Sequence, residues 1–481
     1  MKMRQTYAAF AAGLLLALQL LTGCSKVKDD RNEITDPALQ KNLLELISED
    51  SRLSSFKEYL VKTGYDKVLS SSKAITVFAP ANSALASLDP AIVNDAVKLK
   101  KFIGNHIALK QYRTAELGIK TRIGMLNGKY CNMQQTKIED AAIITADKYA
   151  NNGMLQVIDK ALPALDNCWE FLSNSSDAPV KQKNFMLSLF RKVFDTSKAI
   201  FVGINPLTGE PIYQAGTDSV FTNLFLNRVQ NLEKEEKQYT LFMLTDAAWD
   251  AEQTRFAPYF VTNTPDSNAL VTGWNVIKDF AVDTVYQPNA IPDTITSKFG
   301  TRLPVERSAI VKTVKTSNGI IYIMNRMNVL PASKFKTITI QGEAYNAQST
   351  NRRSNTYFRD RYNTLTGFDF TDVLVLGHGV SLFHLRYDIP EVPSIKYKAY
   401  WVAVNDFQTA TYSQRLAIGV STATTFPYTV VGLNNYNEVY IGEFTQTKYS
   451  PVLNVYLVGA NSTTAAVNPL VCDYIKLVPS L

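Results

Sequence analysis

The sequence has few of the residues on which metal sites and imidazole catalysis depend. Its 481 residues include three His and four Cys, and neither a CxxC nor an HExxH motif occurs. Structural zinc sites need closely spaced thiolate or imidazole ligands. Hydrolases need a paired carboxylate or a Ser/His/Asp arrangement, and none stands out. We therefore expect no metal, no cofactor and no enzymatic activity.

Charge of one sign and membrane-spanning apolar runs are also scarce. The 50 Lys and Arg exceed the 43 Asp and Glu by a net charge of +7, which is too dilute to indicate nucleic-acid binding. The apolar run Ala8–Leu21 is shorter than the roughly 20 residues that a membrane-spanning helix needs. The chain does have 46% hydrophobic residues, which suits a globular protein of about two to four domains.

The N-terminus carries a targeting signal. A basic start, Met1–Arg4, precedes the apolar run, as in a secretory signal peptide, which we assign to residues 1–23. The run ends in Leu-Thr-Gly-Cys, which resembles the lipobox of bacterial lipoproteins. In that family the Cys is acylated and becomes the new N-terminus after cleavage. The resemblance implies lipidation of Cys24; the alternative is a plain secretory peptide with a chance Cys.

A short polar tether follows at residues 24–34. Its Lys28, Asp29 and Asp30 are similar to the export signal of Bacteroidota surface lipoproteins, whereas the alternative is a solvated run of charges. The resemblance implies a protein that is anchored by lipid in the outer membrane and exposed at the cell surface.

Two sequence motifs occur twice, at nearly the same offset. The first is an apolar run with a helix start after it, around Thr76 and again around Thr240. The second is Asn-Gly followed by a Val/Ile-rich run and Leu-Pro, with its glycine at Gly153 and again at Gly319. Because both motifs are repeated at nearly the same offset in the sequence, we expect a duplicated domain.

These motifs resemble those of fasciclin domains, and we place such domains at residues 35–164 and 165–332. The second domain has an enlarged lead-in with a candidate helix at Lys181–Phe194. The family's central Tyr-His segment is matched by His106 in the first copy, and the second copy lacks this His. The resemblance implies compact α/β modules for adhesion and partner contact, without a nucleophile. For His106 we expect structural hydrogen bonding, against metal or catalytic use as the alternative.

Residues 335–481 follow a different pattern, in which short β-rich runs are separated by Gly, Asn, Pro or Ser. This predicts an antiparallel β-sandwich, jelly-roll-like in arrangement. Segments 387–401 and 471–479 look like the galactose-binding-type sandwiches of carbohydrate-binding modules. Tyr397 and Trp401 are therefore candidates for contact with a glycan. They also share one strand face with apolar residues, so a place in the core is the alternative.

Together the patterns predict a multidomain α+β protein. We expect a non-catalytic lipoprotein that captures an extracellular ligand, in particular a glycan, as an accessory subunit beside a SusC/SusD-type nutrient importer. The alternative is an adhesin for host, matrix or neighbouring cells, and neither hypothesis involves nucleic acid. Once Cys24 is acylated, Cys131, Cys168 and Cys472 remain, and we expect free, buried thiols.

Overall fold

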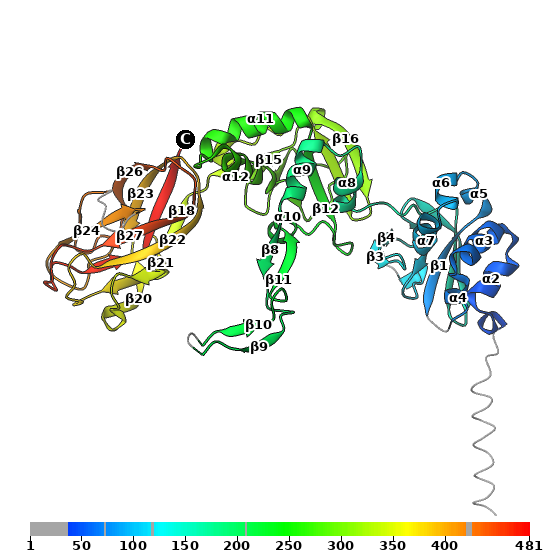
Figure 1. Cartoon of the computed structure of the whole chain (residues 1–481), viewed down its shortest axis with the longest axis horizontal. Coiled ribbons are helices and arrows are strands. Elements are labelled where there is room, and N and C mark those ends of the chain that lie inside the picture. The colour runs from blue at the N-terminus through cyan, green and yellow to red at the C-terminus, as the bar shows by residue number, and fades with distance from the viewer. Residues whose placement is uncertain (1–36, 72–73, 117–119, 207–208, 420–425) are drawn as a thin grey trace, which may run out of the picture. The chain divides into compact units, whose positions relative to one another are not determined.

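The computed structural model describes residues 37–481 except 72–73, 117–119, 207–208 and 420–425. Cys24 and the predicted export signal Lys28–Asp30 lie outside the described residues. No helix in the described part of the chain is both long and apolar enough to span a bilayer. The chain divides into two compact units, shown in Figure 1. One unit comprises Met1–Asn167, Glu233–Gln238 and Lys315–Asn318; the other comprises Cys168–Leu232, Tyr239–Val314 and Gly319–Leu481.

The first unit is built on a seven-stranded sheet with the order β2-β1-β7-β6-β5-β4-β3. Its two central strands, β1 and β7, are parallel, and every residue in them is buried. Burial on both faces explains why both strands are continuous apolar runs in the sequence. The strands are β1 (Ile75–Pro80), β2 (Ile107–Ala108), β3 (Thr121–Gly124), β4 (Tyr130–Met133), β5 (Lys137–Ile138), β6 (Ala141–Ala150) and β7 (Gly153–Ile158).

Short helices that precede and follow β1 in the chain pack their apolar residues against this sheet. Polar side chains fix where several of them begin. Asn42 forms a capping box with Glu45, and Asp95 accepts hydrogen bonds from the backbone N–H groups of Val97 and Lys98. The helices are η1 (Pro37–Gln40), α2 (Leu43–Glu49), η2 (Ser51–Leu53), α3 (Ser54–Thr63), α4 (Asp66–Leu69), α5 (Asn82–Leu85), α6 (Pro90–Val93), α7 (Ala96–Gly104) and η3 (Thr114–Glu116).

The second unit contains a four-stranded sheet with the order β13-β12-β17-β16, which repeats the order β2-β1-β7-β6 of the first unit. Hydrogen bonds repeat as well. The Thr76 hydroxyl donates to the Lys110 carbonyl, and the Thr240 hydroxyl donates to the Thr284 carbonyl. The strands are β12 (Tyr239–Leu244), β13 (Ala281–Val282), β14 (Thr294–Thr296), β15 (Arg302–Pro304), β16 (Ile310–Thr316) and β17 (Gly319–Met324).

The repeated glycines are required by the parallel pairing of these strands. A Cβ atom on Gly153 would lie 2.1 Å from the carbonyl oxygen of Ile75, and one on Gly319 would lie 2.0 Å from that of Tyr239. No side chain fits at that distance, so the Asn-Gly pair marks the start of a strand that lies close beside its neighbour.

The second unit also contains short helices, two of which, Cys168–Asn174 and Asp246–Phe256, contact the four-stranded sheet. The helices are α8 (Cys168–Asn174), α9 (Val180–Ser188), α10 (Leu224–Arg228), α11 (Asp246–Phe256), η4 (Ala257–Tyr259), α12 (Pro265–Ile277), η5 (Arg307–Ala309) and α13 (Pro331–Lys334). The last of these brings Lys334 to the fully buried Asp279, with Nζ 2.5 Å from Oδ2. The pKa of Asp279 is lowered although burial alone would raise it, because the Lys334 ammonium and hydrogen bonds stabilise the carboxylate.

The lead-in to this sheet differs from the predicted helix Lys181–Phe194. The helix α9 ends at Ser188, and the chain continues as a strand that pairs with residues 219–223. Figure 1 shows the resulting ribbon projecting from the rest of the second unit. Its strands are β8 (Phe190–Phe194), β9 (Phe201–Ile204), β10 (Pro211–Tyr213) and β11 (Ser219–Asn223).

The C-terminal third, residues 338–480, is made of antiparallel strands, and we call it the C-terminal sandwich. It has three sheets, with the orders β18-β29-β23-β26, β19-β22-β27-β24-β25 and β20-β21-β28. The α+β class predicted from the sequence is confirmed. The elements are β18 (Ile338–Gln341), β19 (Ala347–Gln348), η6 (Arg353–Asn355), β20 (Thr356–Asn363), β21 (Phe368–Val375), β22 (His384–Val392), β23 (Lys396–Val402), β24 (Tyr412–Ile418), β25 (Thr429–Val431), β26 (Val439–Thr445), β27 (Ser450–Val458), β28 (Leu470–Cys472) and β29 (Tyr474–Ser480).

Candidate functional site

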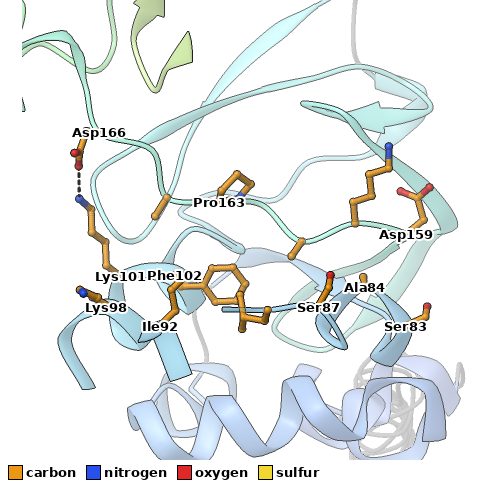
Figure 2. A pocket seen from close by; sticks show the side chains of 14 residues that line it. Ser83, Ala84, Ser87, Ile92, Lys98, Lys101, Phe102, Asp159, Pro163 and Asp166 are labelled. Carbon is orange, nitrogen blue, oxygen red and sulfur yellow. Dashed lines mark hydrogen bonds and ion pairs between the residues drawn. The ribbon is translucent and has the colours of Figure 1, made fainter. Parts of the chain in front are cut away.

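Two hollows stand out as places where a ligand fits, one in each unit. The helix pocket in the first unit has a volume of about 770 Å³ and lies between α5, α6, α7 and the segment 159–166, as Figure 2 shows. Part of its lining is apolar, and Figure 2 shows the side chains of Ile92 and Phe102 side by side there. The full lining is Ser83, Ala84, Ser87, Leu88, Ile92, Lys98, Lys101, Phe102, Asp159, Lys160, Ala161, Pro163, Ala164 and Asp166.

Several polar groups at the rim of the helix pocket are already paired. Lys101 Nζ lies 3.4 Å from Asp166 Oδ1, an ion pair drawn in Figure 2. The Asp159 carboxylate accepts a hydrogen bond of 2.7 Å from the backbone N–H of Ala142. The lining includes neither His nor Cys. This pocket therefore offers mainly apolar contact.

The sandwich hollow, in the second unit, has a volume of about 340 Å³. It forms where the turn between β20 and β21 meets the loop before β26 and the junction of β28 with β29. The lining is Asn363, Leu365, Thr366, Phe368, Asp369, Phe370, Val402, Tyr436, Asn437, Glu438, Asp473 and Tyr474.

Aromatic rings surround the sandwich hollow. Phe368 is 73% exposed, although it is a large apolar side chain. The rings of Phe370 and Tyr436 meet edge to face, with their centroids 6.5 Å apart. The Tyr474 hydroxyl donates a 2.7 Å hydrogen bond to Glu438, which fixes the position of its ring. The hollow thus combines rings with hydrogen-bonding groups, as ligand sites commonly do.

Asp473 is the most unusual residue of the sandwich hollow. It is only 6% exposed, and among the described residues none donates a hydrogen bond to its carboxyl group or forms an ion pair with it. Burial, together with the nearby carboxylates Asp372 and Glu343, raises its pKa to about 7. Asp372 is itself neutralised by Arg359, with Nη2 2.6 Å from Oδ2. A buried carboxyl group without a partner is costly unless something else supplies one.

The two side chains predicted to contact a glycan lie elsewhere. Tyr397 and Trp401 are each 1% exposed, on the central strand β23 between β29 and β26. The Tyr397 ring stacks on Phe444 at 5.4 Å, and burial raises the pKa of its hydroxyl. A sugar cannot reach either ring, so the structure corrects this hypothesis in favour of the core alternative.

The sandwich hollow was missed in the sequence, but its lining has a pattern there. Aromatic and acidic or amide residues alternate next to turns at Phe368–Phe370, at Tyr436–Glu438 and at Asp473–Tyr474. These segments are far apart in the chain, and only the fold brings them together.

His106 has a structural role. It is fully buried, its Nδ1–H donates to the carbonyl of Phe102 at 2.9 Å, and its Nε2 accepts from the N–H of Leu162 at 2.9 Å. Burial lowers its pKa to about 4, so the ring is neutral at physiological pH. In the second copy Phe280 stands in its place: its carbonyl accepts from Phe242 as that of His106 does from Phe78.

The structure supplies no reactive thiol or metal cluster among the residues that it describes. Cys131, Cys168 and Cys472 are buried, and Cys131 and Cys472 are free thiols. Burial raises the pKa of Cys131 to about 12, which keeps it protonated and unreactive. Within the described ranges no group of three or more His, Cys, Asp or Glu is placed to hold a metal ion.

Comparisons with known proteins locate one family in this chain. An uncharacterized protein of Synechocystis sp. is 26% identical over 128 residues, which is 25% of this chain and 96% of that protein. A solved FAS1 domain pair from the insect cell adhesion molecule fasciclin I is 15% identical and covers 60% of this chain and 100% of its own, with a TM-score of 0.23.

A solved family 35 carbohydrate-binding module from Clostridium thermocellum is 14% identical and covers 30% of this chain and 100% of its own, with a TM-score of 0.21. At these TM-scores neither solved structure identifies a ligand for this chain. The sequence model of the fasciclin domain matches residues 51–164. The part of the chain that carries β1, β7 and His106 is a fasciclin domain.

Proposed function

We propose that this protein is a non-catalytic lipoprotein of the outer-membrane surface that captures an extracellular glycan in the sandwich hollow. The observation that carries the proposal is the set of rings and hydrogen-bonding groups that converge there: Phe368, Tyr436 and Tyr474 beside Asp473. Sugar rings present apolar C–H faces that pack on aromatic rings, while their hydroxyl groups need polar partners.

The proposed cellular context follows from the N-terminus. An acyl group on Cys24 would hold the protein at the membrane, and the signal Lys28–Asp30 would direct it to the outside. A glycan-binding lipoprotein at that place fits an accessory subunit of a SusC/SusD-type importer, because ligand capture next to a transporter raises the local concentration of its cargo.

An adhesin is the second candidate, and the fasciclin domain at residues 51–164 favours it. The helix pocket of that domain offers apolar contact surface to a partner. In this case the binding partner would be a protein or matrix on another cell, and removal of the fasciclin domain would abolish attachment.

Glycan capture is tested with the variant Tyr436→Ala. Loss of one stacking ring should weaken binding by about 1–3 kcal/mol, an estimate taken from aromatic stacking on nucleobases. Tyr440→Ala is the matched control, because Tyr440 is an exposed tyrosine of the same sandwich outside the hollow. Binding is measured by calorimetry against a panel of oligosaccharides, with melting temperature as the check on folding. A wild-type protein that binds no oligosaccharide of the panel overturns the proposal.

A further inference from the structure

The sandwich hollow has charge of one sign. Three carboxyl groups line it, those of Asp369, Glu438 and Asp473, and its lining includes no Lys, Arg or His. The nearby cation Lys476 lies outside the lining and is paired with Glu438. The hollow therefore attracts cations and repels anions.

The position of Asp473 gives this charge a specific use. Its backbone N–H donates to Val402 and its carbonyl accepts from Gly342, so the backbone is fully paired while the carboxyl group is not. The residue as a whole is more than nine-tenths buried, and it lines the hollow. A ligand that places hydrogen-bond donors there removes an energetic cost that the free protein carries.

We propose that the sandwich hollow selects amino sugars, with a protonated amino group of the glycan paired with the Asp473 carboxylate. This inference rests on the proposed function, since it names the class of glycan. An ammonium group carries three donors and a positive charge, so it supplies the missing partner in full. A neutral hydroxyl group supplies one donor without charge, and a uronate brings a fourth carboxylate into an anionic hollow.

Proton release should accompany such binding. With a pKa raised to about 7 by burial, Asp372 and Glu343, the Asp473 carboxyl is partly protonated near neutral pH. An ammonium ligand stabilises the ionised form, so binding displaces the proton. Asp372 is held by Arg359, and Glu438 by Lys476 and Tyr474. Those ion pairs provide partners for Asp372 and Glu438, and we expect the displaced proton to come from Asp473. Affinity should then rise from pH 5 to pH 7, the range in which Asp473 becomes ionised and the glycan amines still carry protons.

The test is calorimetry on the mature chain with three tetrasaccharides: β-1,4-linked glucosamine, its N-acetylated form and a glucuronate-containing one. We expect the glucosamine oligomer to bind about tenfold or more tightly than the N-acetylated one, since hydrogen bonds between charged groups are worth roughly twice neutral ones. The heat of binding at pH 6, where the glycan amines are protonated, should depend on the ionisation enthalpy of the buffer, as a displaced proton requires.

The variant Asp473→Asn keeps the shape of the side chain and removes its charge. It should lower the affinity for the glucosamine oligomer about tenfold, change that for the N-acetylated oligomer little, and remove the dependence on buffer. Glu443→Gln is the matched control, because Glu443 is a carboxylate of the same sandwich outside the hollow. Removing a buried carboxyl without a partner should not lower the melting temperature, so the variant is expected to fold.

The outcomes separate the two proposals. If no oligosaccharide binds, glycan capture and the amino-sugar inference both fail. If all three bind equally and Tyr436→Ala weakens each of them, glycan capture stands and the inference is overturned. A preference for glucuronate also overturns it, as does tighter binding of a lysine-rich peptide than of any sugar.

Discussion

His106 illustrates how burial of one residue makes stability depend on pH. The folded ring stays neutral down to about pH 4, whereas the unfolded ring binds a proton below about pH 6.5. Because the unfolded state binds more protons between these values, the free energy of unfolding falls as pH falls. We expect the wild type to lose about 3 kcal/mol from pH 6.5 to pH 4 through this residue.

The measurement is denaturant unfolding of the first unit over this pH range, with His106→Gln as the comparison. Glutamine does not titrate, so the variant should show a flatter pH profile than the wild type. Parallel profiles would contradict a neutral, buried His106.

Trp401 tests the correction made at the sandwich. Its ring is 1% exposed, so Trp401→Ala should cost roughly 3–5 kcal/mol of stability through the cavity that it leaves. Glycan affinity measured below the melting temperature should not change. A stable variant with selectively weakened glycan binding would return Trp401 to the ligand site.

For single residues, the sequence predicts which side chains share one face of a strand. It does not predict whether that face meets the core or a ligand. The sequence shows that Tyr397 and Trp401 share one strand face with apolar residues. This pattern is compatible with a place in the core and with a ligand-binding role. The structure settles the choice because β23 lies between two neighbouring strands and its aromatic face meets the core. Asp473 could not be recognised, since its pKa depends on Asp372 and Glu343, which lie far from it in the chain.

At the scale of elements, the glycines beside β1 and β12 are the sharpest constraint. Gly153→Ala places a Cβ atom 2.1 Å from a backbone oxygen, so β7 must move away from β1. We expect a loss of several kcal/mol, or failure of the first unit to fold, seen as a lower melting temperature.

Gly203→Ala is the control for this prediction. Gly203 also lies in a strand, but a Cβ atom there meets nothing within 4 Å. This variant should differ little from the wild type in stability. Equal losses of stability in the two variants would show that the close contact at Gly153 does not determine the stability of the first unit.

Elements with strong local signals were predicted well, and those that depend on distant pairing were not. The buried strands around Thr76 and Thr240 are continuous apolar runs, and both are found. The candidate helix Lys181–Phe194 ends early because the residues after Ser188 pair with residues 219–223. Such pairing overrides a helical period, and nothing within the segment itself reveals it.

At the scale of the whole molecule, the C-terminal sandwich is predicted to fold as a fragment of residues 335–481. Its strands bury many apolar side chains, which belong to one core cluster together with buried residues of 168–329. At its start Phe335 also packs on Tyr259, with ring centroids 5.0 Å apart, so the fragment loses this contact. We expect a cooperative melting transition with a somewhat lower midpoint than in the full chain. A fragment that shows no cooperative transition would contradict independent folding.

Anchoring is the second prediction for the whole molecule. Cys24→Ala should move the protein from the membrane fraction to the soluble fraction, because Cys24 is the proposed site of acylation. Protease added to intact cells should digest the wild-type protein at the surface. Complete protection in intact cells would place it in the periplasm.

The contact between each strand-initial glycine and the neighbouring backbone also bears on how two sheets with the same strand order change in sequence. Apolar side chains in β7 and β17 can be replaced by other apolar side chains during evolution, because a core can repack around a side chain of different shape. A Cβ atom on Gly319 would lie 2.0 Å from a backbone oxygen, and repacking of side chains cannot relieve that contact. Glycine should therefore persist longer than the apolar residues around it as the sequences of β7 and β17 change. A search for more distant relatives of this sheet would be most sensitive if it required glycine at the start of the strand and allowed any apolar residues in the rest of the strand.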